Sequence, residues 1–148
     1  MSLVISGGWD SRVKFWQWQG PSQLTVISEV YLAMPVHYMS VAYPLMVTAH
    51  QDRLIHVWNL EECFKNNSFE PTEVMESTLK FATTAITCFS NGKGFCIGST
   101  EGRCSVRNYD TTRSDKNKAL DFCFKCHRVE DPKTKSARVY SINGYCFN

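Results

Sequence analysis

The sequence has little that would place it in a membrane, in a fibre or among disordered chains. Its 148 residues contain no apolar stretch near the roughly 18 residues that a membrane-spanning helix needs. The first residues carry no basic cluster ahead of an apolar segment, so we expect no secretory signal peptide. Charged residues make up 20% and aromatic residues 13%, which is typical of a folded domain. We therefore expect a globular chain without membrane insertion.

Motifs for catalysis are also absent. The sequence contains no nucleophile elbow, no Walker phosphate-binding loop, no His-Glu-x-x-His and no paired glycosidase carboxylates. Gly7 and Gly8 precede a Trp-Asp pair and a strand pattern, so they are not predicted to cradle a phosphate at a helix N-terminus. We therefore expect no enzyme, no catalytic residue and no small-molecule substrate.

The seven cysteines are an odd number, and several lie inside apolar segments, as buried free thiols do. Free thiols indicate a reduced, intracellular compartment. Residues 123–127 read Cys-Phe-Lys-Cys-His, which matches the c-type haem attachment motif, but the alternation there predicts a strand with the two cysteines on opposite faces. One such pair is two ligands short of a zinc site unless His37, His50 or His56 joins it. We expect neither a cofactor nor a metal.

Charge is unevenly distributed along the chain. Residues 1–102 contain 6 Lys or Arg and 9 Asp or Glu, whereas residues 103–148 contain 10 and 5. A basic end can attract phosphates or an acidic peptide. The alternative is a solvated surface without a partner.

Three basic residues stand out within this basic end. On a strand predicted at 120–128, Lys125 and His127 share the face opposite the apolar residues. Arg128 is predicted to begin the turn, so its guanidinium can project and bind a carboxylate with two hydrogen bonds. A solvated strand end is the alternative interpretation.

A short pattern occurs three times along the chain. Residues 6–16 match residues 48–58 at an offset of 42, and a weaker copy at 98–107 follows at an offset of 49. In each copy, a short apolar strand runs into a turn with an acidic residue, and an alternating strand follows. Period-2 alternation predicts antiparallel strands. Further short strands are predicted at 37–43, 85–89 and 139–147.

The acidic and aromatic residues of the copies have predicted structural roles. The turn carboxylates are expected to accept backbone N–H bonds. The tryptophan that ends the second strand is expected to donate its N–H to a polar group in the preceding turn. In the third copy, Glu101 and Arg103 are predicted to form an ion pair. The expected blade-turn residues are Trp9, Asp10, Trp16, Asp52, Trp58, Glu101 and Arg103.

A repeat of roughly 40–50 residues with four short strands and a Trp-Asp motif is typical of a WD40 propeller blade. We therefore predict an all-β fold, a partial WD40 β-propeller of about three blades. The expected division is an incomplete blade at 1–33, blades at 34–82 and 83–130, and the first strand of a next blade at 138–148. Surface loops are predicted at 61–77, 111–118 and 130–137. A closed propeller needs at least about four blades, so we expect a fragment, a truncated gene product or a chain completed by a partner.

Collinear segments across nearly the whole chain resemble the WD40-repeat mRNA export factors of the nuclear pore. These segments are 7–10, 13–16, 43–47, 76–80, 94–103, 124–128 and 139–144. The sister family, the spindle-checkpoint propellers that bind Bub kinases, shares Phe-Lys-Cys-His-Arg and Glu-Gly-Arg. Residues 43–47 and 94–99 resemble the export factors more closely. Gly8, where the family usually has Ser, and Gln17-Trp18 depart from the family pattern.

The resemblance implies a seven-bladed, non-enzymatic scaffold that docks a nucleoporin GLEBS-type peptide. The acidic residues of this peptide would contact Arg128, with Lys125 and His127 as weaker contacts. It also implies association with mRNA or ribonucleoprotein, and localisation at the nuclear pore and nuclear envelope with shuttling to the cytoplasm. The alternative function is a checkpoint adaptor that binds a Bub-type kinase peptide. Direct RNA binding through the basic end is a third possibility.

Overall fold

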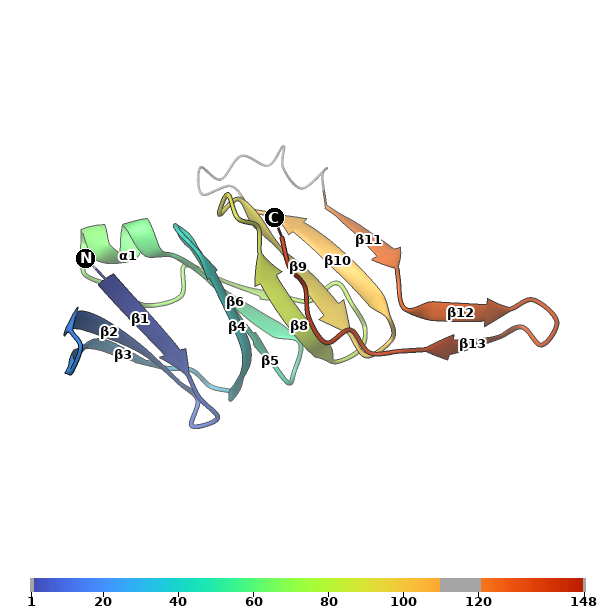
Figure 1. The fold of residues 1–148 in the computed structure, drawn as a ribbon, viewed down its shortest axis with the longest axis horizontal. Helices are drawn as coiled ribbons and strands as arrows, with labels where there is room; N and C mark the ends of the chain where they lie inside the picture. The colour runs from blue at the N-terminus through green and yellow to red at the C-terminus, as the bar shows by residue number, and fades with distance from the viewer. Residues whose placement is uncertain (1, 110–120, 148) are drawn as a thin grey trace.

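The computed structural model of the chain describes residues 2–109 and 121–147. Antiparallel strands make up most of it, with one short helix, and the all-β prediction is confirmed (Figure 1). The elements are β1 (Ser2–Gly7), β2 (Arg12–Gly20), β3 (Gln23–Tyr31), β4 (Val36–Ala42), β5 (Leu45–His50), β6 (Leu54–Asn59), α1 (Leu60–Asn66), β7 (Glu73–Glu76), β8 (Thr83–Cys88), β9 (Gly94–Ser99), β10 (Arg103–Asn108), β11 (Phe122–Lys125), β12 (Arg128–Asp131) and β13 (Ser136–Val139).

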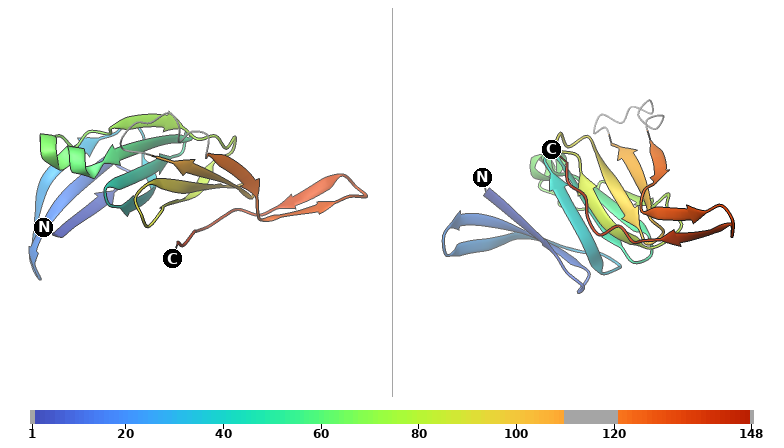
Figure 2. Two further views of the ribbon diagram at one scale, coloured as in Figure 1. Left: turned by 90° about the horizontal axis from the view of Figure 1, so that it is seen from above. Right: turned by 45° about the vertical axis from the view of Figure 1, so that its right-hand side comes forward.

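The strands form consecutive sheets in chain order. The first is three-stranded, β1-β2-β3; the second and third are four-stranded, β4-β5-β6-β7 and β8-β9-β10-β11. Strands β12 and β13 form a separate hairpin. The sheets follow one another along the molecule, with the second between the other two, and the hairpin projects beyond the third (Figures 1 and 2).

The same tight turn recurs in the three sheets. Ser11, Arg53 and Gly102 occupy equivalent positions between the paired strands, and their φ angles of 62°, 68° and 65° are all left-handed. In the first two turns, the preceding carboxylate accepts a backbone N–H two residues on: Asp10 from Arg12 at 3.3 Å, and Asp52 from Leu54 at 3.1 Å. These bonds close the turn in the way that the short acidic side chain favours.

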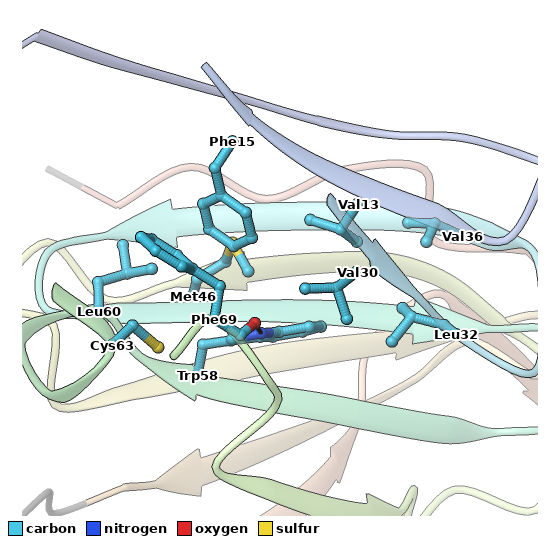
Figure 3. Close-up of a cluster of buried hydrophobic side chains, with 10 residues drawn as sticks. All are labelled: Val13, Phe15, Val30, Leu32, Val36, Met46, Trp58, Leu60, Cys63 and Phe69. Carbon is cyan, nitrogen blue, oxygen red and sulfur yellow. Dashed lines mark hydrogen bonds between the residues drawn. The ribbon is translucent and has the colours of Figure 1, made fainter. Parts of the chain in front are cut away.

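An apolar core joins the first and second sheets. Phe15 and Val13 of β2 face Met46 and Trp58 of the second sheet, and all four are fully buried. Figure 3 shows the cluster, with Phe69 packed among these side chains. The indole of Trp58 donates to the Phe69 carbonyl at 2.9 Å, so its one polar atom is satisfied inside the core.

A second core joins the second and third sheets. It contains Leu45, Val47, Ala49, Ile55, Val57, Leu79, Ile86, Cys88, Phe95 and Ile97. A smaller cluster, Ala85, Cys96, Cys104 and Ile142, lies on the other face of the third sheet. The second sheet therefore packs one face against the first sheet and the other against the third, as propeller blades do.

Two of the predicted loops contain regular structure. Within 61–77, the chain forms α1 and β7. Asn59 caps the helix by accepting from Glu61 N and Glu62 N, and β7 completes the second sheet beside β6. Within 130–137, the end of β12 and the start of β13 pair with each other. The loop prediction was wrong there because both segments gain their hydrogen bonds from partners that local polarity does not reveal. The loop predicted at 111–118 lies outside the described residues.

The strand predicted at 138–148 is not formed as such. Strand β13 ends at Val139, and residues 140–147 join no ladder. A strand needs a hydrogen-bonded neighbour, and the described part of the chain offers none beside this segment.

Candidate peptide-docking site

The three predicted contact residues lie in residues 125–128, which we call the basic segment. It joins the third sheet to the hairpin: Lys125 ends β11 and Arg128 begins β12. The prediction of one continuous strand to residue 128, with Arg128 starting a turn, was wrong. The ladder ends at the pair of Arg103 and Lys125, next to the tight turn at Gly102. The N–H of Cys126 still donates to the Gly102 carbonyl at 3.0 Å, and β12 begins at Arg128.

The turn at Gly102 holds the basic segment closely. A Cβ added at Gly102 would lie 2.5 Å from the His127 carbonyl oxygen, and its φ of 65° is a conformation that glycine adopts without strain. From the other side, the N–H of Tyr140 donates to the same His127 carbonyl at 2.9 Å. The backbone that carries the three basic side chains is therefore fixed by both neighbours.

Arg128 is half-buried, and its guanidinium is oriented by the turn. Its Nη1 donates to the Glu101 carbonyl at 3.2 Å. Its Nε is buried and has no hydrogen-bond partner among the described residues. The Nη1 bond thus orients the guanidinium, a group that can bind a carboxylate through its terminal nitrogens.

Lys125 and His127 are exposed beside Arg128. The ammonium of Lys125 contacts a Glu130 carboxylate oxygen at 2.6 Å, and this bond lowers the pKa of Glu130, with Arg128 and Arg103 contributing. Glu101 and Arg103 form an ion pair at 3.3 Å beneath them. Lys125, Arg128 and Arg103 thus all favour the charged form of Glu130.

A pocket of about 520 Å³ adjoins the segment on the hairpin. Its lining residues are Arg128, Glu130, Asp131, Pro132, Lys135, Ser136 and Ala137. Both charge signs are present, so the pocket suits a polar segment better than an apolar group.

The remaining predicted residues lie in the turns and sheets. Trp9 is 78% exposed, with its ring 5.7 Å from the His37 ring. Trp16 donates to the Ser6 hydroxyl in β1 at 2.9 Å, and Trp58 donates to the Phe69 carbonyl after α1. Neither indole bonds the preceding turn, contrary to expectation, because a neighbouring strand or the connection after α1 offers a closer acceptor.

A buried polar network in the second sheet escaped the sequence analysis, which weighed its histidines only as metal ligands. His50 Nδ1 donates to the Pro35 carbonyl at 2.9 Å, since a carbonyl can only accept. Its Nε2 then accepts from His56 Nδ1 at 2.7 Å and lies 3.0 Å from the Thr48 hydroxyl. The available signal was two histidines six residues apart on paired strands. No group of three or more metal-ligating side chains occurs within residues 2–109 and 121–147.

Burial lowers the pKa of both histidines. For His50, hydrogen bonds to the Pro35 and Met34 carbonyls oppose the effect of burial. For His56, burial and then the charge of His50 lower the pKa to about 4. The pair is therefore neutral at pH 7, as its role in the network requires.

Comparison of the sequence with those of known proteins finds relatives that are named for RNA export. The chain is 37% identical over 149 residues to the Poly(A)+ RNA export protein of Schizosaccharomyces pombe, covering 99% of this chain and 38% of that protein. It is 34% identical over 146 residues to the mRNA export factor GLE2 of Chaetomium thermophilum, covering 99% and 37%. This chain is a WD40-repeat relative of the mRNA export factors. The resemblance stated from the sequence is confirmed.

The export-factor relative also resembles the predicted sister family. It is 32% identical over 149 residues to the Mitotic checkpoint protein BUB3.1 of Arabidopsis thaliana, covering 98% of this chain and 41% of that protein. The chain thus spans less than half the length of these curated relatives. None of the protein-family models matches the chain.

Solved structures support the fold. The Chaetomium thermophilum Sqt1, in a complex with the N-terminus of the ribosomal protein L10, superposes with a TM-score of 0.65 at 11% identity, covering 94% of this chain and 36% of that one. The predicted partial WD40 propeller is confirmed. No helix in the described parts of the export-factor relative is long and apolar enough to cross a membrane.

Proposed function

We propose that this chain is part of a non-enzymatic scaffold in mRNA export that docks an acidic GLEBS-type nucleoporin peptide on the basic segment. The observation that carries the proposal is similarity over 99% of the chain to two proteins named for RNA export. Localisation at the nuclear pore and nuclear envelope, with shuttling and contact with ribonucleoprotein, is proposed on the same ground.

The geometry of the basic segment supports a carboxylate ligand. Arg128 is oriented by its bond to the Glu101 carbonyl, so a peptide carboxylate meets a guanidinium that has already lost part of its conformational freedom. Lys125 is paired with Glu130, and both side chains are more than half exposed. Such exposed pairs contribute little, so an acidic peptide can replace Glu130 at small cost.

The test is a titration of a fluorescent GLEBS-type peptide against the chain and two variants. Arg128→Glu is expected to weaken binding about 10-fold or more, because a charge-assisted hydrogen bond is lost and a like charge replaces it. Lys93→Glu makes the same change of charge in the exposed turn between β8 and β9, and is expected to leave the affinity unchanged. Equal affinities for the wild type and Arg128→Glu would overturn the site.

The second candidate is a checkpoint adaptor that binds a Bub-type kinase peptide. It is favoured by the similarity to the Mitotic checkpoint protein BUB3.1 over 98% of the chain. A side-by-side pull-down with equal amounts of the nucleoporin and kinase peptides separates the two functions. Stronger retention of the kinase peptide would replace the export proposal.

A further inference from the structure

Two free thiols meet inside the third sheet. Cys96 of β9 lies opposite Val106, and Cys104 of β10 lies opposite Gly98, so both cysteines point to the same face of the sheet. Their sulfur atoms are 2.7 Å apart. Both side chains are buried, and both belong to the small apolar cluster on this face.

The separation of the two sulfur atoms lies between a contact and a bond. Carbon atoms that are not bonded rest about 3.5–4.0 Å apart, and the sulfur atoms of a disulfide are about 2.0 Å apart. The two thiols therefore need to approach by only about 0.7 Å to share a bond. The other buried cysteines, Cys63 and Cys88, lie in two different cores and serve as internal controls.

The contact also makes one thiol of the pair the better nucleophile. The hydrogen bond with Cys96 lowers the pKa of Cys104, and this effect outweighs the opposite effect of burial. Burial raises the pKa of Cys63, and it raises the pKa of Cys88 to about 11. Because the thiolate is the form that attacks an oxidant, Cys104 is expected to react before the other buried cysteines.

Side chains, and no paired strand, cover the two thiols. Ile142 completes the buried cluster, and Tyr145 packs against it. A Cβ added at Gly98 would lie 2.6 Å from the Tyr145 hydroxyl, so this tyrosine lies directly over the residue opposite Cys104. Residues 140–147 join no ladder among the described residues, and such a segment opens locally more easily than paired strands do. An oxidant as small as hydrogen peroxide can then reach the sulfur atoms.

The cysteine pair adjoins the turn that holds the basic segment. Cys104 follows Gly102 by two residues, and the Gly102 carbonyl accepts from the Cys126 N–H at 3.0 Å. Gly102 also lies close to the His127 carbonyl. The two cysteines are diagonal neighbours across β9 and β10, and diagonal neighbours are usually further apart than directly opposite ones. A bond between them therefore draws the start of β10 toward β9 and displaces this turn.

We propose that Cys96 and Cys104 form a reversible disulfide in response to peroxide, and that this bond weakens peptide docking on the basic segment. The bond is independent of the proposed function, whereas its effect on docking rests on that function.

The reaction has two steps. The Cys104 thiolate attacks hydrogen peroxide, the O–O bond breaks, and the products are a sulfenic acid and hydroxide, which takes up the proton lost by the Cys104 thiol. The Cys96 sulfur then attacks the sulfenic sulfur, the S–O bond breaks, and the oxygen leaves as water with the Cys96 proton. Both sulfur atoms are oxidised, and the peroxide is reduced to two molecules of water. A thiol reductant reverses the bond by exchange.

Peptide mapping tests the bond. The chain is treated with hydrogen peroxide, its remaining thiols are blocked with N-ethylmaleimide under denaturing conditions, and trypsin then cleaves after Arg103, between the two cysteines. Fragments 94–103 and 104–107 are expected to stay joined until dithiothreitol separates them. Maleimide on both fragments, or a link from 104–107 to the fragment with Cys126, would overturn the pairing.

Two controls show that the link is specific. Cys63 and Cys88 are expected to carry maleimide after the same treatment, because each is buried without a partner thiol nearby. In Cys104→Ser, fragment 94–103 is expected to be free and alkylated. Cys96→Ser gives a second control of the same kind, and circular dichroism shows which variants fold. The same link in the Cys104→Ser chain would overturn the assignment.

The peptide titration tests the effect on docking. The exposed cysteines Cys123, Cys126 and Cys146 also oxidise, so the titration uses a chain in which these three are serine. Peroxide is expected to weaken binding about 5-fold or more, and dithiothreitol is expected to restore it. The same chain with Cys104→Ser is expected to bind equally before and after peroxide.

The outcomes separate the two parts of the proposal from the proposed function. Equal affinities before and after peroxide, in a chain whose disulfide has been mapped, would overturn the effect on docking alone. Equal weakening in the Cys104→Ser chain would overturn it as well. A wild-type chain that forms the mapped disulfide but does not bind the peptide in its reduced form would overturn the proposed function and leave the disulfide in place.

Discussion

Burial in the second sheet destabilises the protonated, charged form of His56. Its Nδ1 donates to His50 Nε2, and His50 Nδ1 donates to the Pro35 carbonyl, so both nitrogens of His50 are engaged while that ring is neutral. Protonating His50 at Nε2 would end the bond that this nitrogen accepts from His56 Nδ1, because a protonated ring nitrogen can only donate. The bond between the two rings therefore forms only while His50 is neutral.

Stability is expected to fall as pH decreases from 7 to 5. The pKa of His56 is about 4 in the folded chain against the ordinary 6.5, so the unfolded chain binds the proton more readily in this window. Lower pH therefore favours unfolding. Thermal melts at pH 7 and pH 5 should differ by about 3 °C or more in the wild type and by less in His56→Gln. His127→Gln, at an exposed site, should keep the wild-type difference.

Gly102 lies in the tight turn between β9 and β10 and allows the basic segment to approach that turn closely. Its left-handed φ and the nearby His127 carbonyl leave no room for a side chain. The same turn in the other sheets tolerates Ser11 and Arg53, so φ alone does not demand glycine. The close approach of the basic segment distinguishes the third sheet.

Gly102→Ala is expected to lower the free energy of unfolding by about 1–3 kcal/mol and to weaken peptide binding. The added Cβ must push the His127 carbonyl away, which moves Arg128. Urea denaturation and the peptide titration measure the two effects. Gly144→Ala is the matched control, since a Cβ there meets nothing within 4 Å. Equal stabilities of the two variants would contradict the close contact.

The short helix α1 depends on its cap. Asn59→Ala removes the acceptor of the Glu61 and Glu62 N–H groups and is expected to cost about 0.5–2 kcal/mol of stability. Asn66→Ala, the same change at the exposed last residue of the helix, should cost less. Denaturant midpoints compare the variants, and an equal loss in both would argue against the capping role.

The sheets share cores, so the molecule is expected to unfold as one unit. Trp58 lies in the core between the first and second sheets, and Ile55 and Val57 of the same strand, β6, lie in the core with the third sheet. Removing Trp58 therefore weakens the contact through which the first sheet is attached.

Trp58→Ala is expected to cost about 3–5 kcal/mol, a large share of the stability of a typical domain. Trp9→Ala makes the same change at an exposed turn and is expected to cost about 0.5 kcal/mol or less. Thermal unfolding followed by circular dichroism measures both. A small effect at Trp58 would show that the first two sheets are stabilised independently.

Local patterns in the sequence predicted the strands that carry the repeat. Alternation marked β2, β6 and β10, and the recurrent acidic turn marked the left-handed positions between paired strands. These features depend on neighbours a few residues apart, so short windows of sequence contain them. The repeat and its collinear segments also sufficed for the family.

Features that depend on distant partners escaped prediction. Strand β7 exists because β6 offers it an edge, and β11 ends at Lys125, opposite Arg103, the residue of β10 next to the tight turn at Gly102. The histidine network needs two strands and a loop to meet.

The strands of the repeat, the acidic turns at Asp10 and Asp52 and the relatives of this protein therefore follow from the order of its residues. The orientation of Arg128 and the burial of His50 and His56 follow from folding. Hydrogen bonds between strands and the packing of sheet on sheet join residues far apart in the chain, and no local pattern records them.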